Sequence, residues 1–204
     1  MNNNLFQLFS IVANHSKNTY LVGGCVRDSI LGVEANDYDM VTDTPMDTLS
    51  PELLSNGWKI SGVGEAFLVY VLSKNGEQYE LANFRKDGIN SKSLPSIGTL
   101  EEDAARRDFT CNALYENPFT KTIFDPNDTG LDDIRSRTLR FIGNPHSRIA
   151  EDSLRVFRFY RFLAQLRFMA DKKSLAACRE MFNEAYKKTT PERVRMELER
   201  MSVI

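Results

Sequence analysis

The stretch LVGGCVRDSILGVEANDYDMVT, residues 21–42, determines the fold that we expect for this chain. A short apolar strand over residues 19–22 leads into two consecutive glycines. A helix over residues 26–31 follows and ends at Gly32, and a second strand of alternating character is predicted over residues 38–42. This succession of strand, helix and strand is typical of an α/β protein.

The Gly23-Gly24 turn lies where the first strand meets the helix. Because glycines carry no side chain, a phosphate can approach the backbone N–H groups of such a turn. The positive end of the helix, with Arg27 in its first turn, points to the same place. Taken alone, a Gly-Gly turn at this junction is also explained by backbone geometry. It is not a P-loop, since no Gly-Lys-Ser or Gly-Lys-Thr follows.

Two aspartates, Asp37 and Asp39, flank Tyr38 at the entrance to the second strand. Alternation along a strand directs both carboxylates to one face, where they can hold Mg²⁺ together with substrate phosphates. Taken alone, such a pair also fits a solvated turn. Together with the glycine turn and Arg27, the pair forms a constellation typical of phosphoryl transfer.

The composition limits the classes of protein to which this chain can belong. The 204 residues are 42% hydrophobic and 26% charged, which fits one large domain or a domain with a small annex and excludes a disordered chain. We find no stretch near the ~20 apolar residues of a membrane span and no convincing signal peptide. Three cysteines without CxxC spacing and two histidines argue against a disulfide framework and exclude a three-histidine metal site. We therefore expect a soluble, cytoplasmic protein without membrane contact.

Hydrophobic periodicity predicts the remaining elements. The predicted helices cover residues 2–18, 45–54 (with Thr44 as its cap), 100–114, 150–168, 171–188 and 191–201. The predicted strands cover residues 58–61, 66–73, 77–84 and 121–124, and residues 86–99 read as a flexible loop. The outline is an α/β front of about 140 residues followed by an all-helical piece.

The charge is distributed unevenly. Residues 1–102 carry 7 Lys and Arg against 13 Asp and Glu, whereas residues 103–204 carry 19 against 15. Eight arginines and no lysine lie between Arg135 and Arg167. Arginine without lysine suits forked recognition of phosphates or bases, and a solvated helix face is the alternative.

Five motifs in order resemble the family of class II tRNA nucleotidyltransferases and bacterial poly(A) polymerases. The first is GGCVRD with LG and the DYD pair, within residues 23–39. The others are RRDFTCNAL (106–114), DPNDTGLDDIRSRTLR (125–140), EDSLRVFRFYRF (151–162) and PERVRMEL (191–198). The chain departs from the family in its longer DPNDTG turn, and it resembles a head and neck only, without body and tail.

The resemblance implies an α/β head, a small mixed sheet with flanking helices, over residues 1–140, followed by a helical neck over residues 141–204. It implies template-independent transfer of CMP and AMP from CTP and ATP to an RNA 3′ end, as in tRNA CCA addition or repair, with Mg²⁺ held by Asp37 and Asp39. A partner chain could supply the missing tRNA-binding region. Poly(A) polymerase, an enzyme adding only C or only A, and a non-catalytic RNA- or nucleotide-binding remnant are the alternatives.

The resemblance also assigns nucleotide-binding residues. These are Gly23, Gly24, Arg27, Arg107, Asp152, Arg155, Arg158 and Arg161, with Asp108 as a ribose contact. The chemistry of Asp152 and Arg155 supports a base-reading role, because a carboxylate acceptor beside a guanidinium donor matches the pairing edge of cytosine and adenine and mismatches uracil and guanine. Solvated arginines, or i,i+4 pairs with acids such as Glu151, are the alternative for this helix. Glu80 is either a third carboxylate near the metal or a solvent-facing strand residue.

Overall fold

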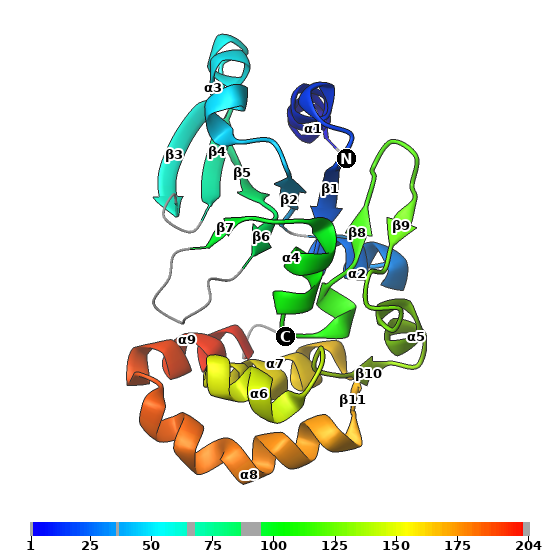
Figure 1. Cartoon of the computed structure of the whole chain (residues 1–204), viewed down its shortest axis with the longest axis vertical. Helices are drawn as coiled ribbons and strands as arrows, with labels where there is room; N and C mark the ends of the chain where they lie inside the picture. The colour runs from blue at the N-terminus through cyan, green and yellow to red at the C-terminus, as the bar shows by residue number, and fades with distance from the viewer. Residues whose placement is uncertain (1, 36, 65–67, 87–94, 202–204) are drawn as a thin grey trace. The chain divides into compact units, whose positions relative to one another are not determined.

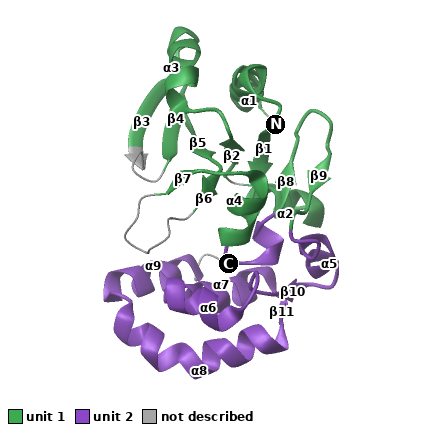
Figure 2. Cartoon of the chain, in the orientation of Figure 1, with its two compact units in different colours: residues 1–106, 114–126 green, residues 107–113, 127–204 purple. Residues whose placement is uncertain are grey.

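The computed structural model describes residues 2–35, 37–64, 68–86 and 95–201. The chain forms two compact units (Figure 2). Unit 1 comprises residues 1–106 and 114–126, and unit 2 comprises residues 107–113 and 127–204. The predicted functional division into head and neck at residue 140 stays a prediction, because the units are defined by compactness and divide the chain differently.

Unit 1 is built on a seven-stranded mixed sheet with the order β3-β4-β5-β2-β1-β8-β9 (Figure 1). Its strands are β1 (Thr19–Val22), β2 (Asp39–Thr42), β3 (Lys59–Gly64), β4 (Val69–Lys74), β5 (Glu77–Asn83), β8 (Tyr115–Glu116) and β9 (Ile123–Phe124). Strands β2 and β5 pair in parallel, and the other neighbours in this sheet pair antiparallel. The predicted fold class, a small mixed sheet with flanking helices, is thus confirmed.

The described residues of unit 1 also form four helices. They are α1 (Asn3–His15), α2 (Gly24–Leu31), α3 (Met46–Ser55) and α4 (Leu100–Arg106). Pro45 rather than the predicted Thr44 is the N-cap residue of α3. Strands β6 (Arg85–Lys86) and β7 (Ser96–Ile97) form a separate antiparallel pair. Most of the predicted flexible loop, residues 87–94, lies outside the described residues.

One face of the sheet carries an apolar cluster that includes Tyr20, Val22, Val41 and Tyr115, and Ala104 brings α4 against it. Alternation places Asp39 on the same face, since Asp39 lies two residues before Val41 and opposite Val22. The apolar cluster therefore supports the strand ends from which the predicted carboxylates project.

Unit 2 is mainly helical. Its helices are α5 (Gly130–Arg135), α6 (Pro145–Glu151), α7 (Arg155–Leu166), α8 (Lys172–Lys188) and α9 (Pro191–Met201), and its strands β10 (Thr138–Leu139) and β11 (Met169–Ala170) pair in parallel. The rings of Phe109, Phe141, Phe159 and Phe162 pack together in its core, with centroid distances of 4.8–6.1 Å. Such clusters bury large apolar area and fix the directions of the side chains around them.

Two predicted helix boundaries are wrong. The helix predicted over 100–114 ends at Arg106, because Phe109 adopts an extended backbone and its N–H bonds the Asp108 side chain at 2.8 Å; a 3₁₀ turn over Thr110–Asn112 follows. The single helix predicted over 150–168 is two helices, since Asp152 is extended (φ −143°, ψ 105°) between α6 and α7. The Asp152 carboxylate accepts the N–H of Leu154 at 3.2 Å, which stabilises this break.

None of the helices within the described residues combines the length and the apolar character of a bilayer-spanning segment. Cys25, Cys111 and Cys178 are buried and free.

Candidate functional site

The first cluster of predicted site residues lies in unit 1, where β1 ends and β2 begins. Val22, the last residue of β1, pairs with Asp39, the first residue of β2, and Gly23 follows directly. On its other side Asp39 pairs in parallel with Glu80 of β5. Residues paired in this way direct their side chains to the same face, so the two exposed carboxylates of Asp39 and Glu80 lie side by side.

The backbone of Asp39 is also close to the first turn of α2. Burial raises the pKa of the Cys25 thiol to about 11, and a hydrogen bond with the Asp39 backbone opposes part of that rise. The glycine turn, the start of α2 and two carboxylates are therefore brought together within a single unit.

The two glycines of the turn differ in what the backbone requires. Gly23 has φ 81° and ψ −129°, a conformation that L side chains rarely adopt. Gly24 has room for a methyl group, whose nearest contact apart from the helix's own backbone would be the side-chain atom Arg27 Nη2 at 3.6 Å. The guanidinium of Arg27 thus lies beside the turn, where it is buried (7% exposed) and paired with Asp28 at 2.7 Å. Its positive charge is held in place beside the turn's backbone.

Asp37 precedes β2 and is exposed. No group of three or more His, Cys, Asp or Glu side chains within the described residues is arranged to hold a metal ion by itself. The donors near the turn are carboxylate oxygens, which are hard ligands. Such a set fits Mg²⁺, which is commonly bound through one or two carboxylates and completed by water and substrate phosphates.

The second cluster lies in unit 2, around the start of α7. Arg158 pairs with Asp108 at 2.6 Å. Burial lowers the pKa of Arg158, and the carboxylates of Asp108, Glu197 and Asp152 more than offset it, so the net shift is upward. Arg107 precedes Asp108, and its carbonyl accepts a 2.6 Å hydrogen bond from Arg148 Nη2. The RRDFT segment is therefore joined to α6 and α7 within one unit.

Asp152 and Arg155 occupy the corner between α6 and α7. Asp152 is 38% exposed in its side chain and faces Arg193 of α9 at 3.4 Å. Arg155 donates to Glu151 and to the Arg148 carbonyl, both at 2.7 Å. The ion pair with Glu151, four residues earlier, is the alternative that the sequence offered for Arg155, and this pair forms in the structure. The base-reading role of Arg155 stays a prediction.

Arg161 occupies a different environment from the other arginines of α7. Its Nε lies 2.5 Å from Glu197 of α9, and the two side chains are among the most buried charged groups of unit 2, 8% and 4% exposed. Its guanidinium also stacks on the Phe162 ring at 4.0 Å. This geometry makes Arg161 a link between α7 and α9. Its predicted contact with nucleotide stays a prediction.

Arg148, Arg193 and Glu197 contribute to this cluster and carried no assigned role in the sequence. Arg148 also pairs with Glu151, and the other two lie in the PERVRMEL motif. The motif could have indicated their role, because Arg193 and Glu197 are four residues apart on one helix and therefore face the same neighbouring residues.

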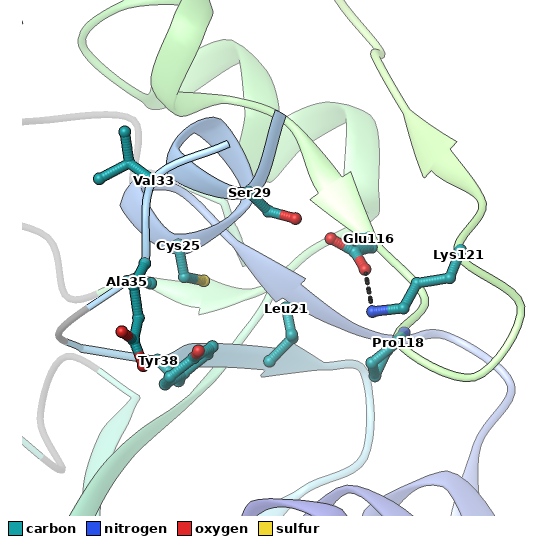
Figure 3. A pocket seen from close by; sticks show the side chains of 10 residues that line it. Leu21, Cys25, Ser29, Val33, Ala35, Tyr38, Glu116, Pro118 and Lys121 are labelled. Carbon is teal, nitrogen blue, oxygen red and sulfur yellow. Dashed lines mark hydrogen bonds and ion pairs between the residues drawn. The ribbon is translucent and has the colours of Figure 1, made fainter. Parts of the chain in front are cut away.

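A pocket of about 190 Å³ lies on the opposite face of the sheet from Asp39 (Figure 3). Leu21 and Glu116, which are register partners and alternate with Val22, line it together with Tyr38 and Lys121. Glu116 and Lys121 form an ion pair of 2.9 Å at its edge. None of the residues predicted for catalysis or nucleotide binding lines this pocket.

Comparison with known protein families matches the poly A polymerase head domain to residues 19–140. The chain belongs to this family. The matched segment contains the glycine turn, both aspartates and the RRDFTCNAL motif.

Several curated proteins are similar to this chain. The poly(A) polymerase I of Haemophilus influenzae is 34% identical over 178 residues, which are 79% of this chain and 38% of that protein. The CCA-adding enzyme of Enterococcus faecalis is 36% identical over 188 residues, 89% of this chain and 44% of that protein. The chain spans less than half the length of these relatives.

Solved structures give the same result for the fold. The CCA-adding enzyme of Bacillus stearothermophilus in complex with CTP superposes with a TM-score of 0.81 and 29% identity, over 98% of this chain and 49% of that one. A tRNA nucleotidyltransferase complexed with a primer tRNA and an incoming ATP analogue gives 0.75 and 27%, over 90% and 54%.

Proposed function

We propose that this chain transfers nucleotides from CTP and ATP to the 3′ end of an RNA, as in tRNA CCA addition or repair. The observation that carries the proposal is the register of β1, β2 and β5, which brings Asp39 and Glu80 together directly beside the Gly23-Gly24 turn. Relatives named as CCA-adding enzymes, and a related structure that holds CTP, support the choice of substrates.

In the proposed reaction the 3′ hydroxyl oxygen of the RNA attacks the α-phosphorus of the nucleotide. A new O3′–P bond forms, the hydroxyl proton leaves to solvent, the bond between the α-phosphorus and the bridging oxygen breaks, and pyrophosphate leaves. Asp37 and Asp39, with Glu80 beside them, would hold divalent ions, and Mg²⁺ fits their oxygen donors. Bound there, the metal supplies positive charge for the phosphates and lowers the pKa of the attacking hydroxyl.

The chain's own groups near the turn would orient the triphosphate. Gly23 and Gly24 leave their backbone accessible, and Arg27 adds a fixed positive charge beside them. Alignment of the phosphate chain by such preorganised groups lowers the entropic part of the barrier.

In unit 2 we propose that Asp152 and Arg155 read the base. The Asp152 carboxylate accepts from the exocyclic amino group of cytosine or adenine, and Arg155 donates to the neighbouring ring nitrogen. Arg158 and Arg107 would contact the sugar or the phosphates. Asp108, which pairs with Arg158, holds that arginine in place and is the proposed ribose contact. Arg161 acts through α9, as its pair with Glu197 suggests.

One assay tests the proposal and separates it from the alternatives. The protein is incubated with Mg²⁺, each labelled nucleoside triphosphate in turn, and tRNAs ending before C, after the first C and after CC. CCA addition requires C on the first two substrates and one A on the third. Repeated A addition identifies a poly(A) polymerase. This is the second candidate function because the Haemophilus influenzae relative is named as a poly(A) polymerase. Incorporation of a single base type identifies a C-only or A-only enzyme.

Nucleotide binding without incorporation, when a full-length relative is active under the same conditions, identifies a non-catalytic binding protein and refutes the proposal. The relatives are more than twice as long as the matched part of this chain. We therefore propose that another domain or a partner chain supplies further contacts to the RNA. A cytoplasmic location, where these substrates are made, stays a prediction.

A further inference from the structure

A second pocket of unit 1 lies at the other end of the β1–β2 pair from Asp39. Its volume is about 380 Å³, within the range of about 300–1,000 Å³ that is usual for small-molecule sites. Tyr20 of β1 and Asp43, which follows β2, line it. Asp43 lies four positions after Asp39, about 13 Å along an extended chain. The pocket is therefore separate from the proposed catalytic carboxylates.

Tyr20 is the first observation that indicates a ligand. The residue as a whole is 7% exposed and lines the pocket, and its hydroxyl has no hydrogen-bond partner among the described residues. The hydroxyl oxygen is not one of the fully buried, unpartnered side-chain atoms of those residues, so it remains accessible. The hydroxyl is thus available to a molecule in the pocket.

The charge of the pocket indicates the sign of that molecule. Asp43 accepts from Asn18 Nδ2 at 2.8 Å through one oxygen, which leaves the other available, and Glu101 at the start of α4 forms no ion pair within the described part of the chain. Burial raises the pKa of Tyr20, and the charges of Asp43 and Glu101 raise it further, so both carboxylates act on its hydroxyl. Among the described residues that line the pocket there is no lysine or arginine.

The rest of the wall is aromatic and aliphatic. Phe124 packs edge-on against Tyr20 with a centroid distance of 5.0 Å, and Phe84 lies 6.3 Å from Tyr20. Leu100 completes this apolar side. Carboxylates combined with aromatic rings favour ammonium groups, which gain from both the negative charge and the ring faces.

We propose that this pocket binds a small aliphatic amine. The ammonium group donates hydrogen bonds to Asp43, Glu101 and the Tyr20 hydroxyl oxygen, and the methylene groups lie against Phe124 and Leu100. The proposal concerns a site outside the nucleotidyl-transfer centre and does not depend on that activity.

The test uses 1,4-diaminobutane as the probe and 1,4-butanediol as the neutral molecule of similar shape. Calorimetric titration of the full chain should show saturable binding of the diamine and none of the diol. The diamine should also raise the melting temperature, because a ligand that binds the folded state stabilises it. Absence of saturable diamine binding, or equal binding of the diol, overturns the proposal.

Three variants localise the binding. Glu101→Gln and Asp43→Asn should each weaken diamine binding by about threefold to tenfold, as expected for loss of one charge in a partly exposed site. Asp128→Asn, a matched change at an exposed aspartate of unit 2, should leave it unchanged. Glu101 is exposed, so its variant folds even if the Asp43 variant does not. Equal affinities of Glu101→Gln and Asp128→Asn would show that the amine binds elsewhere.

Discussion

A methyl group added to Gly24 would meet Arg27 Nη2 at 3.6 Å, an ordinary van der Waals distance, and Gly24 does not have the positive φ of Gly23. We therefore expect Gly24→Ala to fold with a melting temperature close to that of the parent protein. The same methyl group obstructs a phosphate that approaches the turn, so CTP binding should weaken by about tenfold or more, roughly 1.4 kcal/mol. Calorimetry with CTP and a thermal melt measure the two effects.

Gly23→Ala is the matched comparison for this experiment. Its positive-φ backbone (φ 81°, ψ −129°) costs an L residue about 1–3 kcal/mol, so this variant should lose stability as well as binding. A Gly24→Ala protein that binds CTP normally would show that the turn is glycine-rich for backbone geometry alone.

The carboxylates near the turn give a sharper prediction. Asp37 and Asp39 are exposed and carry little of the core, so Asp37→Ala and Asp39→Ala should fold normally and lose nucleotide incorporation. Loss of a metal ligand in phosphoryl transfer removes several kcal/mol of transition-state stabilisation, at about 1.4 kcal/mol per tenfold in rate. Incorporation rates measured over a range of Mg²⁺ concentrations check this. Asp47→Ala, an exposed aspartate of α3, is the control, and near-normal turnover with unchanged Mg²⁺ dependence in Asp39→Ala would remove the assignment.

Asp152 has two structural contacts besides its proposed role, the Leu154 N–H and the Arg193 guanidinium. If it reads the base, Asp152→Ala should reduce selectivity against UTP by roughly tenfold to a hundredfold, since a good base contact discriminates by about 1–3 kcal/mol. Incorporation of all four nucleotides, measured beside the melting temperature, checks this.

Arg193→Ala is the control for Asp152, because it removes the ion pair and keeps the carboxylate. If Asp152 only caps the start of α7, Asp152→Ala loses about 0.5–2 kcal/mol of stability and keeps its base preference. That pattern would contradict base reading.

Among the helices, α7 and α9 are joined by the buried pair of Arg161 and Glu197. Removing one partner leaves an uncompensated buried charge, so Glu197→Gln should destabilise unit 2 by about 3–5 kcal/mol. Glu199→Gln changes an exposed residue two positions further along α9 and should alter stability by no more than about 0.5 kcal/mol. Urea unfolding of both variants measures the difference, and equal stabilities would mean that the pair contributes nothing to the packing of α9.

The helices and strands with strong local signals could be predicted from the sequence. The apolar spacing of α1, the short apolar strand β1 and the long amphipathic α8 all lie within two to three residues of the predicted bounds. The break at Asp152 could not be predicted, because residues 150–168 have helical periodicity throughout. It depends on a local bond from the Asp152 side chain to Leu154 that competes with the helix.

The candidate site, like the helices, could be predicted from the sequence only where the signal is local. Spacing predicted the glycine turn and the aspartates as one constellation, but the position of Glu80 beside Asp39 depends on the parallel pairing of β2 with β5, which sequence separation does not reveal. The burial of Arg161 depends on Glu197, 36 residues away. Long-range partners of this kind decide whether a motif arginine is exposed to ligand or used in packing.

Considered as a whole, the molecule has an acidic first half and a basic second half, with 19 Lys and Arg against 15 Asp and Glu in residues 103–204. RNA bound through phosphate contacts with that half releases counterions, so affinity should fall steeply with salt. We expect tRNA binding to weaken at least about tenfold between roughly 50 and 200 mM salt. Filter binding or fluorescence anisotropy of the isolated chain measures this. Tight binding that is insensitive to salt would show that non-ionic contacts dominate.

The interleaving of the two units has a consequence for synthesis of the chain on the ribosome. Unit 1 includes residues 114–126, which emerge only after residues 107–113 of unit 2. Until then one edge of β1 lacks its partner β8, and the sheet ends at β1 instead of continuing to β8 and β9. An unpaired edge attracts other strands. A nascent chain stalled before residue 114 should therefore bind chaperones or aggregate, whereas one stalled far enough beyond residue 126 for that residue to leave the exit tunnel has every strand of the sheet available.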